Sequence, residues 1–239
     1  MIRERDADDT SAYFSKGQDL LQMKRPQDAI NIFNEVIVLG KKRMASDILS
    51  KGYYYLGISF KQIGKKGESY EYFCKSLDYG IEMNDWNTLN NSFTEILSLG
   101  LDQEKRNYLR IILKRFFEKG NLLVNYSQYK DAIECYNLLV SHGPAIEDWI
   151  ILAKTYINMG FIYIDLEKSK ESINIFEKAI YYSEKAKYSE GLGNAYLNLG
   201  FAYSNLNLKD ESIQALKKAV NYSENAKNYK LAGNAYLNL

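Results

Sequence analysis

The stretch Gly193-Asn-Ala-Tyr-Leu-Asn-Leu199 occurs a second time, unchanged, as Gly233–Leu239, at a spacing of 40 along the chain. A looser copy, Ala153-Lys-Thr-Tyr-Ile-Asn-Met159, precedes the first by the same spacing. Self-similarity at a fixed period of about 20 to 50 residues is typical of solenoids, in which each repeat buries its apolar face only against its neighbours. The sequence therefore predicts a solenoid.

The composition favours an ordered, helical chain without a membrane or nucleic-acid partner. Apolar residues make up 46% of the 239 residues, and only Pro26 and Pro144 interrupt the potential for helix formation. The net charge of +1, from 31 basic and 30 acidic residues, gives no electrostatic basis for binding nucleic acid or an anionic membrane. No apolar run approaches the length that a membrane span needs, and the charged residues 1–9 do not form a signal peptide. We expect a soluble, cytoplasmic protein.

The two cysteines, Cys74 and Cys135, lie far apart in the sequence on segments that we expect to be different helices. Free, buried thiols in a reducing compartment are favoured over a disulfide, which remains the alternative.

Glycines recur at the same spacing of 40 inside apolar segments, at Gly17 and Gly57 and again at Gly160 and Gly200. A glycine there costs about 1 kcal/mol of helix propensity. Its repetition predicts a first helix that another helix approaches closely. A second segment begins some ten residues later, and its apolar and small residues lie at i, i+4, i+7 and i+8, on one face of a helix. In one repeat these residues are Ser172, Phe176, Ala179 and Ile180.

This pattern resembles the tetratricopeptide repeat, which has an aromatic residue, a large apolar residue and a glycine on its first helix, and small and aromatic residues on its second. The matching residues in five repeats are Tyr13, Gly17, Leu20, Ala29 and Phe33; Tyr53, Leu56, Gly57, Phe60, Ser69 and Phe73; Phe116, Gly120, Leu123, Ala132 and Tyr136; Tyr156, Gly160, Tyr163, Ser172, Phe176 and Ala179; and Tyr196, Gly200, Tyr203, Ser212, Leu216 and Ala219. The period of 40, rather than the usual 34, is similar to the longer repeats of the kinesin light chain and G-protein-modulator type. The resemblance covers nearly the whole chain. It implies an all-α fold, an α-solenoid of stacked antiparallel helix pairs with a right-handed superhelix.

The register breaks in the middle of the chain. A glycine is expected at position 97, where Leu97 stands, and the next matching glycine is Gly120, a shift of 23 positions. We predict one long helix over residues 103–126, with Gly120 in its interior; a repeat with one helix missing is the alternative. The break divides the array into repeats at 1–100 and repeats at 101–239, of which the last is incomplete, and we expect the chain to be part of a longer one.

The sequence offers little that would support catalysis. The single histidine, His142, has no Cys, Asp or Glu at metal-ligand spacing. Gly191-Leu-Gly193 lacks the lysine and the preceding strand of a nucleotide-binding loop. Most of the 21 tyrosines fall at the repeated core spacings and not in a nucleic-acid groove with interleaved arginine. We expect no enzyme activity, no metal and no cofactor.

A row of polar residues on the first helices is the candidate binding site, because the resemblance places these helices on the concave side of the solenoid. In peptide-binding members of the family an asparagine two residues after the buried tyrosine commonly bonds the ligand backbone. The residues at this and neighbouring places are Asn158, Asn198, Asn238, Asn194, Asn234, Lys154 and Lys114. An amide offers both donors and an acceptor, which suits an extended peptide. The alternative is a set of solvated residues that duplication has copied. The family's clamp of two Lys, two Asn and one Arg for C-terminal carboxylates is not reproduced in full.

We therefore expect a non-catalytic protein-interaction module or scaffold that holds a peptide or a partner helix in a concave groove. The alternative is a sensor or regulatory array within a larger effector, such as a signalling ATPase, a protease or a transcription regulator. Apolar residues at the C-terminal edge, Tyr236, Leu237 and Leu239, cannot all turn inward together. We expect a weak homodimer through that edge.

Overall fold

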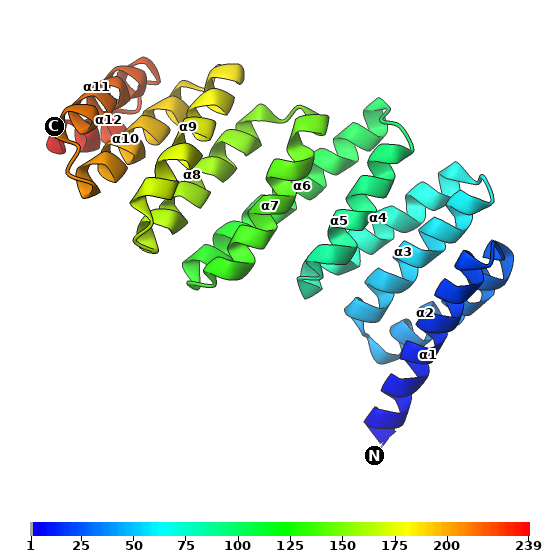
Figure 1. Ribbon diagram of the computed structural model, residues 1–239. Helices are drawn as coiled ribbons and strands as arrows, with labels where there is room; N and C mark the ends of the chain where they lie inside the picture. The colour runs from blue at the N-terminus through cyan, green and yellow to red at the C-terminus, as the bar shows by residue number, and fades with distance from the viewer. Residues whose placement is uncertain (1) are drawn as a thin grey trace. The chain divides into compact units, whose positions relative to one another are not determined.

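The computed structural model describes the backbone of residues 2–239 and the side chains from Thr10 onward. In this described part the chain forms twelve α-helices and no β-strand (Figure 1). In chain order the helices are α1 (Ile2–Gln22), α2 (Pro26–Arg43), α3 (Ser46–Gln62), α4 (Lys66–Met83), α5 (Trp86–Ser98), α6 (Gln103–Asn125), α7 (Tyr129–Ile146), α8 (Trp149–Asp165), α9 (Ser169–Lys185), α10 (Ser189–Asn205), α11 (Lys209–Asn225) and α12 (Tyr229–Leu237). The predicted all-α fold is confirmed.

Helices that follow one another in the sequence pack side by side in pairs. The pairs α1–α2, α3–α4, α8–α9 and α10–α11 are each followed by a helix that packs on the second member of the pair. First helices also contact the next first helix, as α8 contacts α10. Each repeat therefore buries its apolar face against its immediate neighbours, as the stacked array predicted from the period of 40 requires.

The chain divides between Arg106 and Asn107 into two compact units, unit 1 before the division and unit 2 after it. Helix α6 is unbroken over 23 residues, compared with 17 or 18 for α7 to α11. The predicted continuous helix over residues 103–126 is confirmed, and Gly120 lies in its interior.

A residue in the left-handed conformation lies in the turn after each helix from α1 to α11, and within each unit these turns are 20 residues apart, except for the turn after the shorter helix α5. Positive φ angles occur at Lys24, Met44, Gly64, Asn84 and Gly100 in unit 1 and at Ser127, Glu147, Glu167, Lys187, Asn207 and Lys227 in unit 2. At Glu167 (φ 60°) the amide of Lys168 bonds the carbonyl of Tyr163 and the amide of Glu167 bonds that of Ile164, as in a Schellman motif. Most of these positions hold a residue other than glycine, at a cost of about 1–2 kcal/mol each. Two helices, each with its turn, make up the period of 40.

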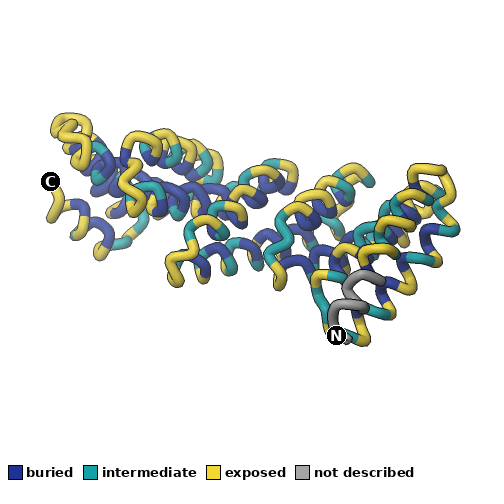
Figure 2. The backbone as a smooth tube through the Cα atoms, turned by 60° about the horizontal axis from the view of Figure 1, so that its bottom comes forward, coloured by how far each residue is buried: buried dark blue, intermediate teal, exposed yellow. Residues whose placement is uncertain are grey.

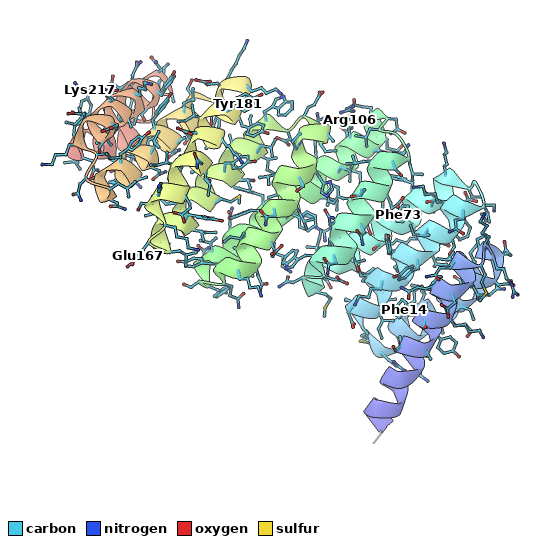
Figure 3. The ribbon with its side chains drawn as sticks, in the orientation of Figure 1. Phe14, Phe73, Arg106, Glu167, Tyr181 and Lys217 are labelled. Carbon is cyan, nitrogen blue, oxygen red and sulfur yellow. The ribbon has the colours of Figure 1, made fainter. Side chains whose placement is uncertain are left out.

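In five of the helix pairs a glycine of the first helix at position i contacts a large side chain at position i+16, on the second helix. A Cβ atom built on Gly160 would lie under 3.0 Å from three atoms of the ring of Phe176, which is fully buried. The equivalent pairs are Gly17–Phe33, Gly57–Phe73, Gly120–Tyr136 and Gly200–Leu216. Figure 2 shows how buried and exposed residues alternate around the helices, and Phe73 is labelled in Figure 3. The close approach predicted from the repeated glycines is confirmed.

Stacked tyrosines join the helices of three pairs at one recurring position. The ring centroids lie 5.6 Å apart in Tyr53–Tyr79, 5.4 Å in Tyr156–Tyr182 and 5.6 Å in Tyr196–Tyr222, with interplanar angles of 20° or less. A lysine, Lys75, Lys178 or Lys218, places its Nζ atom 5.0–5.8 Å from the centroid of the first ring. Tyr181, labelled in Figure 3, is next to a stacked ring in the sequence. Its side chain is 56% exposed. Most of the aromatic content therefore serves packing, as predicted.

Candidate functional site

Two adjoining clefts run between α6 and α8 in unit 2, and together they are called the α6–α8 groove. The first has a volume of about 460 Å³ and the second of about 310 Å³, and Asn121 lines both. The first cleft combines apolar side chains with charged ones: Ile111, Phe117, Ile150, Arg110, Lys114, Lys154, Glu118 and Asp148. The second cleft is lined by Val124, Asn125, Tyr136, Asn158, Phe161 and Asp165 together with Asn121.

Local chemistry places these side chains. At the start of α8, Asp148 caps the helix by accepting a hydrogen bond of 3.2 Å from the amide of Ile151. The guanidinium of Arg110 on α6 donates to the carbonyl of Ile146 at the end of α7. The Arg110 bond joins α6 to the end of α7, the Asp148 cap fixes where α8 begins, and residues of α6 and α8 line the groove.

Large apolar side chains stand exposed on this groove. Ile111 is 61% exposed, Ile150 45% and Phe161 44%. Apolar side chains that gather on one hollowed surface indicate an interaction site, whereas scattered ones need no explanation.

A network of three hydrogen bonds lies in the wall of the second cleft. The hydroxyl of the buried Tyr136 donates to Oδ1 of Asn121 at 2.7 Å, and Nδ2 of Asn158 donates to the same oxygen at 2.6 Å. Nδ2 of Asn158 also lies 3.4 Å from the Tyr136 hydroxyl. Burial raises the pKa of Tyr136 to about 12, so its hydroxyl stays protonated and remains a donor at neutral pH.

Three of the residues expected from the sequence, Asn158, Lys154 and Lys114, line this groove. Nζ of Lys114 lies 3.9 Å from the carboxylate of Glu118 in an exposed pair. Nζ of Lys154 lies 5.6 Å from the centroid of the Tyr188 ring. The two lysines are one period of 40 apart and occupy the same place on α6 and α8.

The remaining expected residues lie on α10, on α12 and, for Asn238, directly after α12, outside the α6–α8 groove. The Nδ2 atoms of Asn194, Asn198 and Asn238 donate to carbonyls four residues earlier in their own helices, at 2.7–3.0 Å. Asn198 is only 3% exposed, and Asn234 is exposed. These amide donors are engaged within their helices, unlike the amide of Asn121.

Neither Asn121 nor the apolar residues of the groove are marked by the repeat pattern. Asn121 follows the glycine of its helix, and Phe161 and Phe201 take that place in α8 and α10, so no repetition marked it. A search for polar residues one place after each glycine would have found it.

The remaining titratable groups of interest lie in the core. Burial lowers the pKa of His142, which is 6% exposed, to about 4. Cys135 is a free thiol that donates to the carbonyl of Phe116 at 2.9 Å, and burial raises its pKa to about 12. Within the described residues, no three His, Cys, Asp or Glu side chains gather as a metal site requires. No helix in that part of the chain is both long and apolar enough to cross a membrane.

Comparison with known proteins gives one family match. Residues 151–225 match the family model described as a tetratricopeptide repeat. Among curated proteins, none matches the sequence significantly.

Three solved structures illustrate the similarity. A putative kinesin light chain from Podosopora anserina with nearly identical TPR-like repeats is 12% identical, covers 91% of this chain and 96% of its own, and has a TM-score of 0.43. MamA from Desulfovibrio magneticus is 18% identical, with coverage of 91% and 97% and a TM-score of 0.40. The TPR2AB domain of yeast Sti1, in complex with pHSP90, is 18% identical, with coverage of 95% and 85% and a TM-score of 0.41.

Proposed function

The chain is a tetratricopeptide-repeat protein, with residues 151–225 matching the family model, and from this premise we propose that unit 2 is a non-catalytic interaction module. Its α6–α8 groove holds an extended peptide segment of a partner protein. The observation that carries the proposal is the combination, on one groove, of exposed apolar side chains with two amides that keep hydrogen-bonding groups available.

The dimensions and lining of the groove fit side chains that alternate along an extended segment. Volumes of about 460 Å³ and 310 Å³ fall within the range of about 300–1,000 Å³ that is typical of ligand sites. The apolar side chains of Ile111 and Ile150 line the first cleft and that of Phe161 lines the second. Burying these exposed apolar side chains provides the driving force for binding.

The charges give the bound segment a direction. Arg110, Lys114 and Lys154 line the first cleft, whereas Asp165 lines the second. Asp148 is engaged in capping α8 and Glu118 lies near Lys114, so the basic groups favour an acidic side chain of the partner in the first cleft.

An extended segment fits this groove better than a partner helix does. A helix uses its backbone N–H and C=O groups internally and has none to offer to Asn121 and Asn158 in mid-groove. An extended chain leaves both groups free at every residue.

The test is selection of peptides from a random-sequence library by the full chain, followed by calorimetric titration of the selected peptide. Asn121→Ala combined with Asn158→Ala should weaken binding by at least about tenfold, since each lost hydrogen bond is worth on the order of 1 kcal/mol. The matched control removes two amides outside the groove, by Asn194→Ala with Asn234→Ala, and should leave the affinity unchanged. Failure to select any peptide, or equal effects of both pairs, would refute the proposal.

A further inference from the structure

We infer that the hydroxyl of Tyr136 is a specificity-determining group, which makes the groove accept an internal peptide bond and reject a free carboxylate at Asn121 and Asn158. The inference rests on the proposed peptide-binding function and names the chemical group that this part of the groove binds. It assigns to Tyr136 a positioning role, since its hydroxyl acts through the two amides.

The hydrogen bonds within the network leave one carbonyl and one NH₂ group available. Oδ1 of Asn121 accepts from the Tyr136 hydroxyl and from Nδ2 of Asn158, which uses both of its lone pairs. Nδ2 of Asn158 donates to Oδ1 of Asn121 and lies 3.4 Å from the Tyr136 oxygen. Among the described residues, Nδ2 of Asn121 and Oδ1 of Asn158 have no such bonds, and both side chains line the second cleft.

This result does not depend on which way the amides are turned. If both amides rotate by half a turn, the Asn121 NH₂ group donates to the Asn158 carbonyl, and the Tyr136 hydroxyl can then donate to that carbonyl. In each arrangement one amide donates and the other accepts within the pair. One donor and one acceptor therefore always remain for a ligand.

A donor beside an acceptor matches a peptide group and opposes a carboxylate. In an extended chain the N–H and C=O of one residue point to the same side, so both can bond at once to the Asn158 carbonyl and the Asn121 NH₂ group. A carboxylate has only acceptors, and its second oxygen would face the carbonyl oxygen of the pair. The buried Tyr136 hydroxyl holds this arrangement by fixing one amide against the other.

The packing does not require this hydroxyl. The side chains that occupy the same place against the glycines of other helix pairs are Phe33, Phe73, Phe176 and Leu216, none of which carries a hydroxyl group. The hydroxyl of Tyr136 is an addition to a position that phenylalanine fills elsewhere in the chain. Tyr136→Phe therefore keeps the ring in the core and removes only the hydrogen bond.

The first experiment follows the side-chain amide NMR signals of Asn121 and Asn158 in the full chain. N-methylacetamide, a neutral peptide-bond probe, is compared with sodium acetate at equal concentration. In the natural chain N-methylacetamide should shift these signals and acetate should not. In Tyr136→Phe the preference of the amide pair for N-methylacetamide over acetate should fall by about tenfold, the equivalent of one hydrogen bond. The signals of Asn194 serve as an internal control, and circular dichroism verifies the fold of the variant.

Three results would overturn the inference: acetate shifts the signals as strongly as N-methylacetamide, neither probe shifts them, or the preference survives in Tyr136→Phe. The second experiment uses the selected peptide, shortened so that its terminal carboxylate reaches the amide pair. As an acid it should bind at least about tenfold more weakly than as an amide, and Tyr136→Phe should reduce that ratio. If no peptide is selected but the probes discriminate as expected, the proposed function fails and the role of Tyr136 stands.

Discussion

Replacing Gly160 by alanine should destabilise unit 2, although alanine is the better helix former. The added Cβ would lie under 3.0 Å from three atoms of the Phe176 ring, which has no exposed surface and cannot move aside freely. Ordinary contacts of this kind are 3.4–4 Å long. Overpacking costs about 1–3 kcal/mol, and overlap at this depth belongs at the upper end of that range. Alanine recovers about 1 kcal/mol of helix propensity, so the net loss is about 1–2 kcal/mol.

Urea unfolding followed by far-ultraviolet circular dichroism measures this loss, which corresponds to a fall of about 2–8 °C in Tm for a chain of this size. Gly233→Ala is the matched control, because Gly233 lies inside α12 and no atom stands within 4 Å of the place that its methyl group would take. It should raise stability by about 0.5–1 kcal/mol. Phe176→Leu should restore part of the stability lost in Gly160→Ala, since leucine occupies the same place against Gly200. If Gly160→Ala proves as stable as Gly233→Ala, the close-approach argument is wrong.

Four further outcomes are expected. Burial lowers the pKa of His142 from about 6.5 to about 4, so the unfolded chain binds this proton more readily than the folded chain. The free energy of unfolding should therefore be highest above pH 6.5 and fall by about 3 kcal/mol as the pH is lowered to 4. His142→Gln should remove this pH dependence of the urea midpoint, and NMR of the single imidazole checks the pKa. Cys135, whose thiol pKa burial raises, should react with iodoacetamide only after unfolding, whereas the half-buried Cys74 should react in the folded chain, as mass spectrometry would show. Glu167→Gly should raise the free energy of unfolding by about 0.5–1 kcal/mol, because glycine adopts the left-handed conformation without steric cost. Leu237, 87% exposed, should contribute to weak self-association, and light scattering should detect less of it in Leu237→Glu.

Much of the fold could be predicted from the sequence because its period is carried by residues that cannot be exchanged freely. A glycine such as Gly160 is required where a ring packs on the helix backbone. Such glycines recur in the sequence and make the period of 40 visible. The long helix α6 could be predicted from the shift in that register. The left-handed turns could not, because their bonds join backbone groups and residues as different as Met44 and Glu147 occupy them.

The candidate site could be predicted only in part. Lys154, Lys114 and Asn158 occupy repeated positions and were found by counting along the helices. Asn121 has no counterpart in the next two first helices, so only the packing of α6 against α7 and α8 reveals it. Sequence spacing also does not show whether an amide faces solvent or its own helix, which is why Asn198 and Asn158 looked equivalent.

The packing of each helix on its immediate neighbours has a mechanical consequence. Because a helix pair is held by the pair before and the pair after it, tension applied along the chain acts on one interface at a time. Detaching one pair releases about 40 residues, which span roughly 130–145 Å when extended at about 3.3–3.6 Å per residue, so the chain lengthens in one step by that length less the distance that the folded pair spanned. Such an array yields under load in a series of similar extensions.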